Sequence, residues 1–371
     1  MTVKEIIKME FKDFQIGGLH IALPIIQGGM GVRVSTSSLA SAVSNEGALG
    51  VIAAVALGEG QDGTEQDYRE RSSESLKESI RETRALTKNP FGVNIMCALT
   101  NYDDLVGVAQ DESVDVIISG AGLPLKLPSL VKNIKTKLIP IVSSARAANI
   151  ICSMWQRKHK RLPDAVIVEG PLAGGHLGYS REELADKENF SLDNILQKVI
   201  AVVRGFETNV KKIPVIAAGG IFDGKDIARV IRLGAGAVQM ATRFVCTDEC
   251  DVAPEYKQAY LTAEKEDIVI IQSPVGLPGR VIRNEFVKKI TQGERMDFGC
   301  KYRCLATCDP KKVNYCIAKA LISASRGLMD KGFAMCGSNA YRIKSIVSVK
   351  QLITELVNDT REKLGDASMV F

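Results

Sequence analysis

The chain has 371 residues, 46% hydrophobic and 25% charged, a composition typical of a globular protein with one large domain or two. Its net charge is only +5 and aromatic residues make up 5%, which argues against a nucleic-acid binder that stacks bases on aromatic rings. No apolar run reaches the roughly 18 residues of a membrane span, and the first residues lack the apolar core of a secretory signal. Nine scattered cysteines form no disulfide framework, so we expect a cytoplasmic protein.

Short apolar runs recur along the first part of the chain, with helix-like segments between them. The runs are continuously apolar, which is typical of parallel strands covered on both faces. We expect strands at 21–29, 47–54, 91–96, 114–120, 138–144, 165–170, 213–220 and 236–242, and helices that include 36–46, 66–88, 147–158 and 224–235. Eight such units favour an α/β fold, a (β/α)8 TIM barrel, over a doubly wound sheet.

The pattern changes after residue 243. We expect a short helix over 254–265, a loop or extended segment over 271–282, and helices from residue 311 onward. The prediction is a barrel over residues 1–282 and a C-terminal helical segment, residues 283–371, that packs on or caps it.

Glycine and small residues close the last two predicted strands. Such ends of strands seven and eight often bind a phosphate in barrels, because the backbone N–H groups can approach its oxygens. The alternative is that the glycines only end the strands, but two such ends on consecutive strands favour a phosphate-bearing ligand. The residues concerned are Gly219 and Gly220 after strand seven, and Gln239, Met240, Ala241 and Thr242 at the end of strand eight.

The segment VEGPLAGGHLGYS, residues 168–180, follows the sixth predicted strand. Glu169 ends the strand, and Ala173, Gly174 and Gly175 form a loop with small side chains against which a flat ring could lie. His176 follows at the end of the barrel where active sites form, and an imidazole suits proton abstraction near neutral pH. The alternative is a histidine that only makes local hydrogen bonds.

Polar and small residues at other strand ends are further candidates. Gly29 and Met30 follow strand one, and Asn94 lies within strand three. A buried asparagine needs a hydrogen-bond partner, which is either a ligand or neighbouring backbone. Ser143 and Ser144 close strand five, with the same two alternatives.

Together these segments resemble the nitronate monooxygenase family, formerly called 2-nitropropane dioxygenases. The matching pieces are PIIQGGMG (24–31), FGVN (91–94), EGPLAGGHLG (169–178), IPVIAAGGI (213–221) and GAGAVQMATRF (234–244). The resemblance implies a barrel that binds FMN noncovalently, with Asn94, Glu169, Gly174, Gly219 and Gln239 to Thr242 at the flavin and His176 as catalytic base. It also implies a small-molecule substrate and oxygen as reaction partners.

The chain departs from the family pattern at three places. Ala241 stands where the family usually has Gly, Leu172 replaces an acidic or polar residue, and the cysteine-rich tail lies outside the core motifs. The same barrel and AGGH segment occur in a flavin-dependent enoyl-acyl-carrier-protein reductase that uses NAD(P)H, which is the alternative function. A flavin-free phosphate-binding isomerase or aldolase is a third, although no predicted strand ends in the lysine that a Schiff base would need. Oligomeric state stays open, and a homo-oligomer is compatible with the sequence.

Four late cysteines need a separate interpretation. Cys300, Cys304 and Cys308 are spaced by four, which would place them on one helix face, and Cys316 follows eight residues later. Four thiolates can bind zinc or an iron–sulfur cluster, but no C-x-x-C pair is present and Asp309-Pro310 would interrupt a helix. We therefore predict free thiols and no metal.

Overall fold

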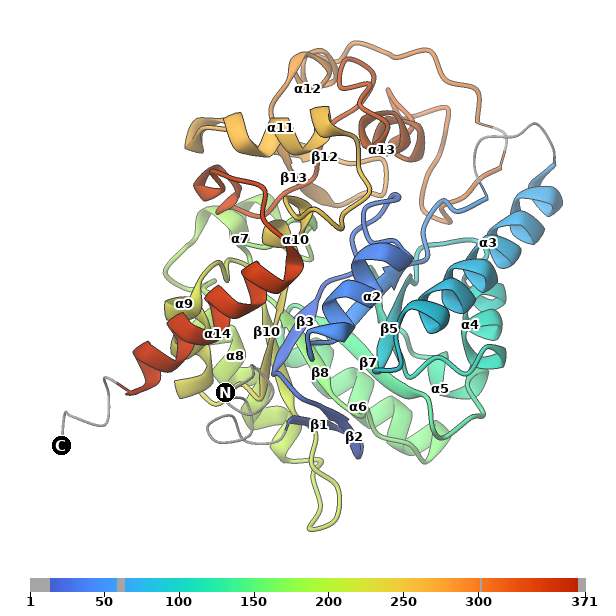
Figure 1. Ribbon diagram of the computed structural model, residues 1–371. Coiled ribbons are helices and arrows are strands. Elements are labelled where there is room, and N and C mark those ends of the chain that lie inside the picture. The colour runs from blue at the N-terminus through green and yellow to red at the C-terminus, as the bar shows by residue number, and fades with distance from the viewer. Residues whose placement is uncertain (1–13, 59–63, 301, 366–371) are drawn as a thin grey trace.

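The computed structural model describes residues 14–58, 64–300 and 302–365 (Figure 1). Eight parallel strands form one sheet in the order β3-β11-β10-β8-β7-β6-β5-β4. A parallel bridge between Ile26 and Leu49 joins the two outer strands, so the sheet is a nearly closed barrel. The strands are β3 (Ile25–Gln27), β4 (Gly50–Ala53), β5 (Phe91–Met96), β6 (Val116–Gly120), β7 (Lys137–Val142), β8 (Val166–Glu169), β10 (Val215–Ala218) and β11 (Ala237–Met240).

The eight predicted strands and the TIM-barrel fold are thus confirmed. Several predicted runs extend past the observed strand, because the chain turns away from the sheet at its glycines. Gly219 and Gly220 adopt φ values of +91° and +81°, which end the ladder directly after β10.

Helices cover the outside of the barrel. Side-chain caps begin several of them: Thr64 forms a reciprocal capping box with Asp67, and Ser144, Ser191 and Asp223 accept backbone N–H groups. The helices are α2 (Ser37–Asn45), α3 (Glu65–Leu86), α4 (Tyr102–Asp111), α5 (Leu127–Leu130), α6 (Ala145–His159), α7 (Arg181–Ala185), α8 (Leu192–Arg204), α9 (Gly224–Arg232) and α10 (Thr242–Val245). Most of these helices bury apolar residues, whereas α7 buries none.

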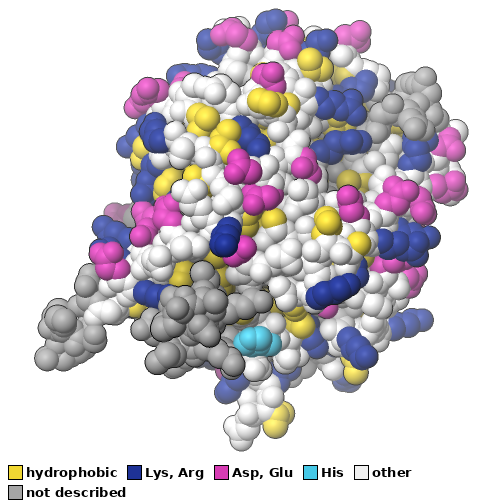
Figure 2. Space-filling view, in the orientation of Figure 1, with side chains coloured by type: hydrophobic (Ala, Val, Ile, Leu, Met, Phe, Trp, Pro, Cys, Tyr) yellow, Lys and Arg dark blue, Asp and Glu magenta, His cyan; other side chains and the backbone are white. Residues whose placement is uncertain are grey.

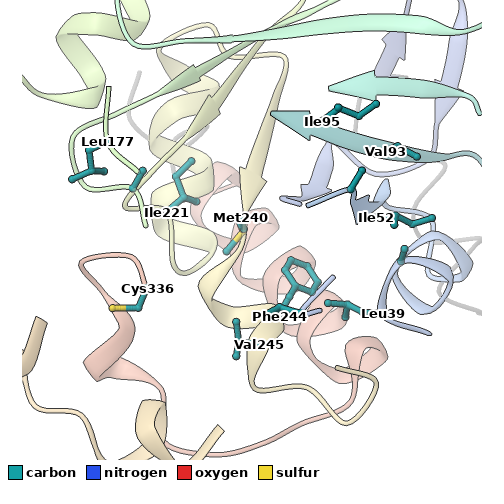
Figure 3. Packing of buried hydrophobic residues seen from close by; sticks show 14 of the residues in the cluster. Leu39, Ile52, Val93, Ile95, Leu177, Ile221, Met240, Phe244, Val245 and Cys336 are labelled. Atoms are coloured by element: carbon teal, nitrogen blue, oxygen red, sulfur yellow. The ribbon is translucent and has the colours of Figure 1, made fainter. Parts of the chain in front are cut away.

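The core has two parts. An antiparallel hairpin of β1 (Phe14–Ile16) and β2 (Leu19–Ile21), which the sequence analysis did not predict, packs Phe14, Ile16 and Ile21 against residues of the barrel interior. The larger cluster includes Leu39, Met240 and Phe244 between the strands and the helices, and it continues to Cys336 in the C-terminal segment (Figure 3).

The chain after the barrel gathers over the carboxyl ends of the strands, except for its last helix, α14 (Val349–Gly365), which returns to the side of the barrel (Figure 1). It contains α11 (Pro254–Thr262), η1 (Lys265–Asp267), β12 (Ile268–Gln272), β13 (Pro278–Ile282), α12 (Glu285–Thr291), α13 (Ile317–Ser325), η2 (Ala340–Arg342) and α14. Helix α14 packs against α9 of the barrel. The predicted division of the chain at residue 282 stays a prediction.

Residues 271–282, predicted as a loop or extended segment, contribute to a β12–β13 hairpin, and β9 (Gly175–His176) joins it as a third strand. The expectation for the segment that follows needs correction. The predicted helix from residue 311 begins only at Ile317, and Cys300, Cys304 and Cys308 lie outside any helix. Pro310 has no N–H to donate and disfavours a helical conformation at the residue before it.

The surface shows lysine and arginine interspersed with aspartate and glutamate (Figure 2). Within the described residues, no helix combines the length and the apolar character that crossing a membrane requires.

Candidate active site

A cavity of about 260 Å³ lies at the carboxyl end of the barrel, between the strand ends and the C-terminal segment. Every residue predicted for the cofactor and catalytic sites lines it. These are Gly29, Met30, Asn94, Glu169, Ala173, Gly174, Gly175, His176, Gly219, Gly220, Gln239, Met240, Ala241 and Thr242. Barrel topology explains the convergence, since parallel strands bring all of their carboxyl ends to one face.

Glycines allow the backbone segments at one end of the cavity to approach closely. A Cβ atom placed on Gly219 would lie 2.9 Å from the carbonyl oxygen of Gly170 and 3.0 Å from the amide nitrogen of Ala173. Among the described residues, none of the turn and loop hydrogen bonds uses the N–H of Gly219, Gly220 or Thr242. These N–H groups therefore remain available to an anion, which fits the predicted phosphate site.

The first strand end is fixed by a polar network. Gln27, which is fully buried, donates to the Ser35 hydroxyl over 2.7 Å and accepts the Val51 N–H over 3.0 Å. The Met30 N–H in turn donates to Ser35 over 2.8 Å. The network holds the Gly28–Met30 turn against Asn94, where a Cβ atom on Gly29 would lie 2.4 Å from the Cβ of Asn94.

Of the buried side-chain atoms without a hydrogen-bond partner in the described residues, one belongs to a residue that lines this cavity: the Oε1 atom of Gln239 is buried and accepts no hydrogen bond. Leaving such an atom without a partner costs about 1–3 kcal/mol. A ligand that donates to the Gln239 oxygen would remove this cost, so this acceptor fits a polar planar group with an N–H on its edge, such as a flavin.

The two serines that close β7 have other roles. The Ser144 hydroxyl caps helix α6 by accepting the Ala147 N–H over 3.2 Å. The Ser143 carbonyl accepts the Tyr179 hydroxyl over 3.2 Å. Neither serine is among the residues that line the cavity. Both therefore fit the alternative of hydrogen bonding to neighbouring backbone instead of to a ligand.

His176 lies in β9, where it pairs with Gly279 of β13. Its Nε2 atom is 2.7 Å from the hydroxyl oxygen of Ser273. Burial lowers the pKa of His176 to about 4, so the imidazole is neutral at pH 7. In the tautomer in which Nε2 donates to the hydroxyl, the neutral ring can accept a proton at Nδ1.

Sequence reasoning missed Ser273. It lies just after β12, almost 100 residues from His176, and also accepts the Val275 N–H over 3.2 Å. No local pattern in SPVGLPG identifies it, because its role depends on the pairing of β9 with β13.

Glu169 provides a carboxyl group that lines the cavity at the end of β8. Burial raises its pKa to about 7. Within the described part of the chain, neither lysine nor arginine lines the cavity. An anionic cofactor would therefore depend on backbone N–H groups and on charges behind the cavity wall.

The outer part of the cavity is mainly apolar and comes from segments that the sequence analysis did not connect with the site. Its residues include Tyr68, Leu99, Val275, Leu305, Ile317, Leu321 and Met335. Helix α13, the loop around Leu305 and the β12–β13 connection therefore form one wall.

None of the cysteines in the described residues forms a disulfide. Cys304 lines the cavity, Cys300 is exposed, and Cys308 and Cys316 are partly buried. The described chain contains no group of three or more His, Cys, Asp or Glu side chains that could hold a metal ion.

Comparisons with known proteins agree with this geometry. A family model described as nitronate monooxygenase matches residues 12–359. The structure of FabK from Thermotoga maritima is 34% identical, with a TM-score of 0.74 over 94% of this chain and 96% of that one.

Two curated relatives cover less of the chain. A (3aS,4S,5R,7aS)-5-hydroxy-7a-methyl-1-oxo-octahydro-1H-indene-4-carboxyl-CoA dehydrogenase from Mycobacterium tuberculosis is 32% identical over 75% of this chain and 68% of its own length. A probable nitronate monooxygenase from Staphylococcus aureus is 28% identical over 74% of this chain and 79% of its own. The family match over nearly the whole chain and the barrel with its lined cavity lead to one conclusion: the chain belongs to the nitronate monooxygenase family of flavin-dependent oxidoreductases.

Proposed function

We propose that the chain binds FMN noncovalently and uses it to oxidise alkyl nitronates with molecular oxygen. The observation that carries the proposal is a neutral His176, held by Ser273, in the same cavity as a glycine-lined anion site. Family membership supports a flavin.

The cofactor assignment follows from the donors around the cavity. Gly219, Gly220 and Thr242 would hold a single phosphate, while Asn94 and Gln239 would pair with the polar edge of the ring. The small loop of Ala173, Gly174 and Gly175 and the Gly29–Met30 turn would lie against its faces. The glycine-rich strand ends fit one phosphate and offer no second site for an adenylate, which favours FMN over FAD.

The protein's own contribution is a base and its orientation. When Nε2 of His176 donates to Ser273, the lone pair is on Nδ1, which would remove the proton from the carbon next to the nitro group of a nitroalkane and so produce the nitronate that is oxidised. Ser273 then keeps the ring and its tautomer fixed. A bound FMN supplies the electron acceptor and the reaction with oxygen.

A second candidate is an NAD(P)H-dependent reductase of enoyl thioesters. The apolar outer wall, with Leu305, Ile317 and Leu321, favours it because an acyl chain would bury apolar surface there. The match to FabK extends over nearly the whole chain. The third alternative, a flavin-free isomerase or aldolase, is wrong, because the family consists of flavin-dependent oxidoreductases.

Two assays on the same flavin-loaded preparation separate the candidates. We expect oxygen uptake with an alkyl nitronate and only slow NADH or NADPH oxidation with an enoyl thioester. Rapid NAD(P)H oxidation that depends on the thioester, without nitronate-dependent oxygen uptake, would establish the reductase instead.

A further inference from the structure

A buried cation without a carboxylate partner lies directly behind the cavity wall. Arg280, in the middle of β13, is only 7% exposed. Its backbone pairs with Gly175 of β9, and its guanidinium donates to the carbonyl oxygen of Ala173. Its side chain thus contacts the loop that precedes His176.

The surroundings of Arg280 do not neutralise its charge. Arg280 takes part in no ion pair among the described residues. The ionisable group that influences its pKa is the Cys336 thiol. Burial raises the pKa of Cys336 to about 12, so this thiol is neutral at pH 7. The guanidinium remains cationic although burial lowers its pKa. An unpaired buried charge is costly, and a nearby anion would offset that cost.

The position of Arg280 points to the anion. Ala173, whose carbonyl oxygen accepts from Arg280, lies against Gly219: its amide nitrogen is 3.0 Å from the position of a Cβ atom placed on Gly219. Gly337, next to Cys336, donates its N–H to the Thr242 hydroxyl over 2.9 Å. Arg280 therefore lies behind the residues that would hold a phosphate, among them Gly219 and Thr242. In the described residues, no cationic side chain lines the cavity itself.

We propose that Arg280 is the positioning residue that makes this site selective for a phosphorylated flavin, by placing a buried positive charge behind the Ala173–Gly175 loop. This inference rests on the proposed FMN site and goes beyond it, because it assigns the phosphate's countercharge to a residue outside the cavity lining. The charge acts through the loop and not by direct contact.

The test compares FMN with riboflavin, which lacks the phosphate, as ligands of flavin-free protein. In Arg280→Met the affinity for FMN should fall by roughly 10- to 100-fold, since each tenfold step corresponds to about 1.4 kcal/mol of lost interaction. Riboflavin affinity should change little. Arg280→Lys, which keeps the charge, should retain most of the preference for FMN. Arg283→Met is the matched control, because Arg283 lies just beyond the same strand, exposed and paired with Asp267 at 3.0 Å.

Equal losses for FMN and riboflavin would show that Arg280 only shapes the loop, and unchanged affinities would show that it has no role. Either result overturns the inference. If Arg280→Met does not fold, Arg280→Gln, which keeps a donor for Ala173 without the charge, is measured instead. A wild-type protein that binds neither flavin would overturn the proposed cofactor itself, an outcome distinct from the failure of Arg280 alone.

Discussion

Substitution of Gly219 by alanine tests whether this glycine is needed for phosphate binding or only for its positive φ. Gly219 has φ +91°, a region where a side chain costs about 1–2 kcal/mol. A new Cβ would also lie 2.9 Å from the Gly170 carbonyl oxygen and 3.0 Å from the Ala173 nitrogen. Both neighbours are backbone atoms, so the loop that carries Ala173 to His176 has to move.

Gly293 is the matched control. It has φ +86°, but a Cβ there would meet nothing within 4 Å, and it does not line the cavity. We expect Gly293→Ala to lower the free energy of unfolding by about 1–2 kcal/mol, measured by chemical denaturation of flavin-free protein, and Gly219→Ala to lower it by more, because its Cβ also meets backbone atoms. Only Gly219→Ala should also weaken FMN binding, by about tenfold or more, in a fluorescence titration. Wild-type FMN affinity in Gly219→Ala would refute the phosphate assignment.

Two further predictions concern the titratable groups of the cavity. His176→Ala should keep FMN bound but lower turnover of a neutral nitroalkane by roughly 10²–10⁴-fold, measured as steady-state oxygen uptake. Turnover of the preformed nitronate should fall much less, because its proton is already gone. Equal losses for the two substrates would mean that His176 orients the anion instead. Since the pKa of His176 is about 4, the wild-type rate should not fall on the acid side until the pH approaches that value. Glu169→Gln should stabilise the flavin-free protein at pH 8 but not at pH 4. Burial raises the pKa of the Glu169 carboxyl from 4.5 to about 7, so at pH 8 the folded protein holds a buried negative charge that destabilises it, whereas at pH 4 the carboxyl is neutral. The gain, up to about 3 kcal/mol for such a shift, is measured by denaturation at both pH values, and a gain that is independent of pH would contradict the burial of Glu169.

The sequence was sufficient for the barrel because its signals are local. Most of the buried parallel strands are continuous apolar runs, such as AVIV before Glu169, and many runs end in small residues. Topology then brings these ends together, which is why Gly29, Asn94, His176 and Thr242 all line one cavity although they are far apart in the chain.

What the sequence did not reveal depends on pairing between distant segments. Ser273 reaches His176 only because β13 pairs with β9, and Arg280 contacts Ala173 for the same reason. The cysteine spacing suggested a helix that the structure does not contain, since the regular spacing of Cys300, Cys304 and Cys308 has no apolar periodicity to support it. The apolar wall from Leu305 to Leu321 likewise has no local signature of a binding site.

The identity of the flavin carried by the purified protein tests the central claim most directly. The protein should be yellow, with the absorbance of an oxidised flavin, and should release FMN on denaturation, as identified by chromatography against FMN, FAD and riboflavin standards. Release of FAD, or a colourless protein that does not bind added FMN, would contradict the assignment of a single-phosphate site to Gly219, Gly220 and Thr242.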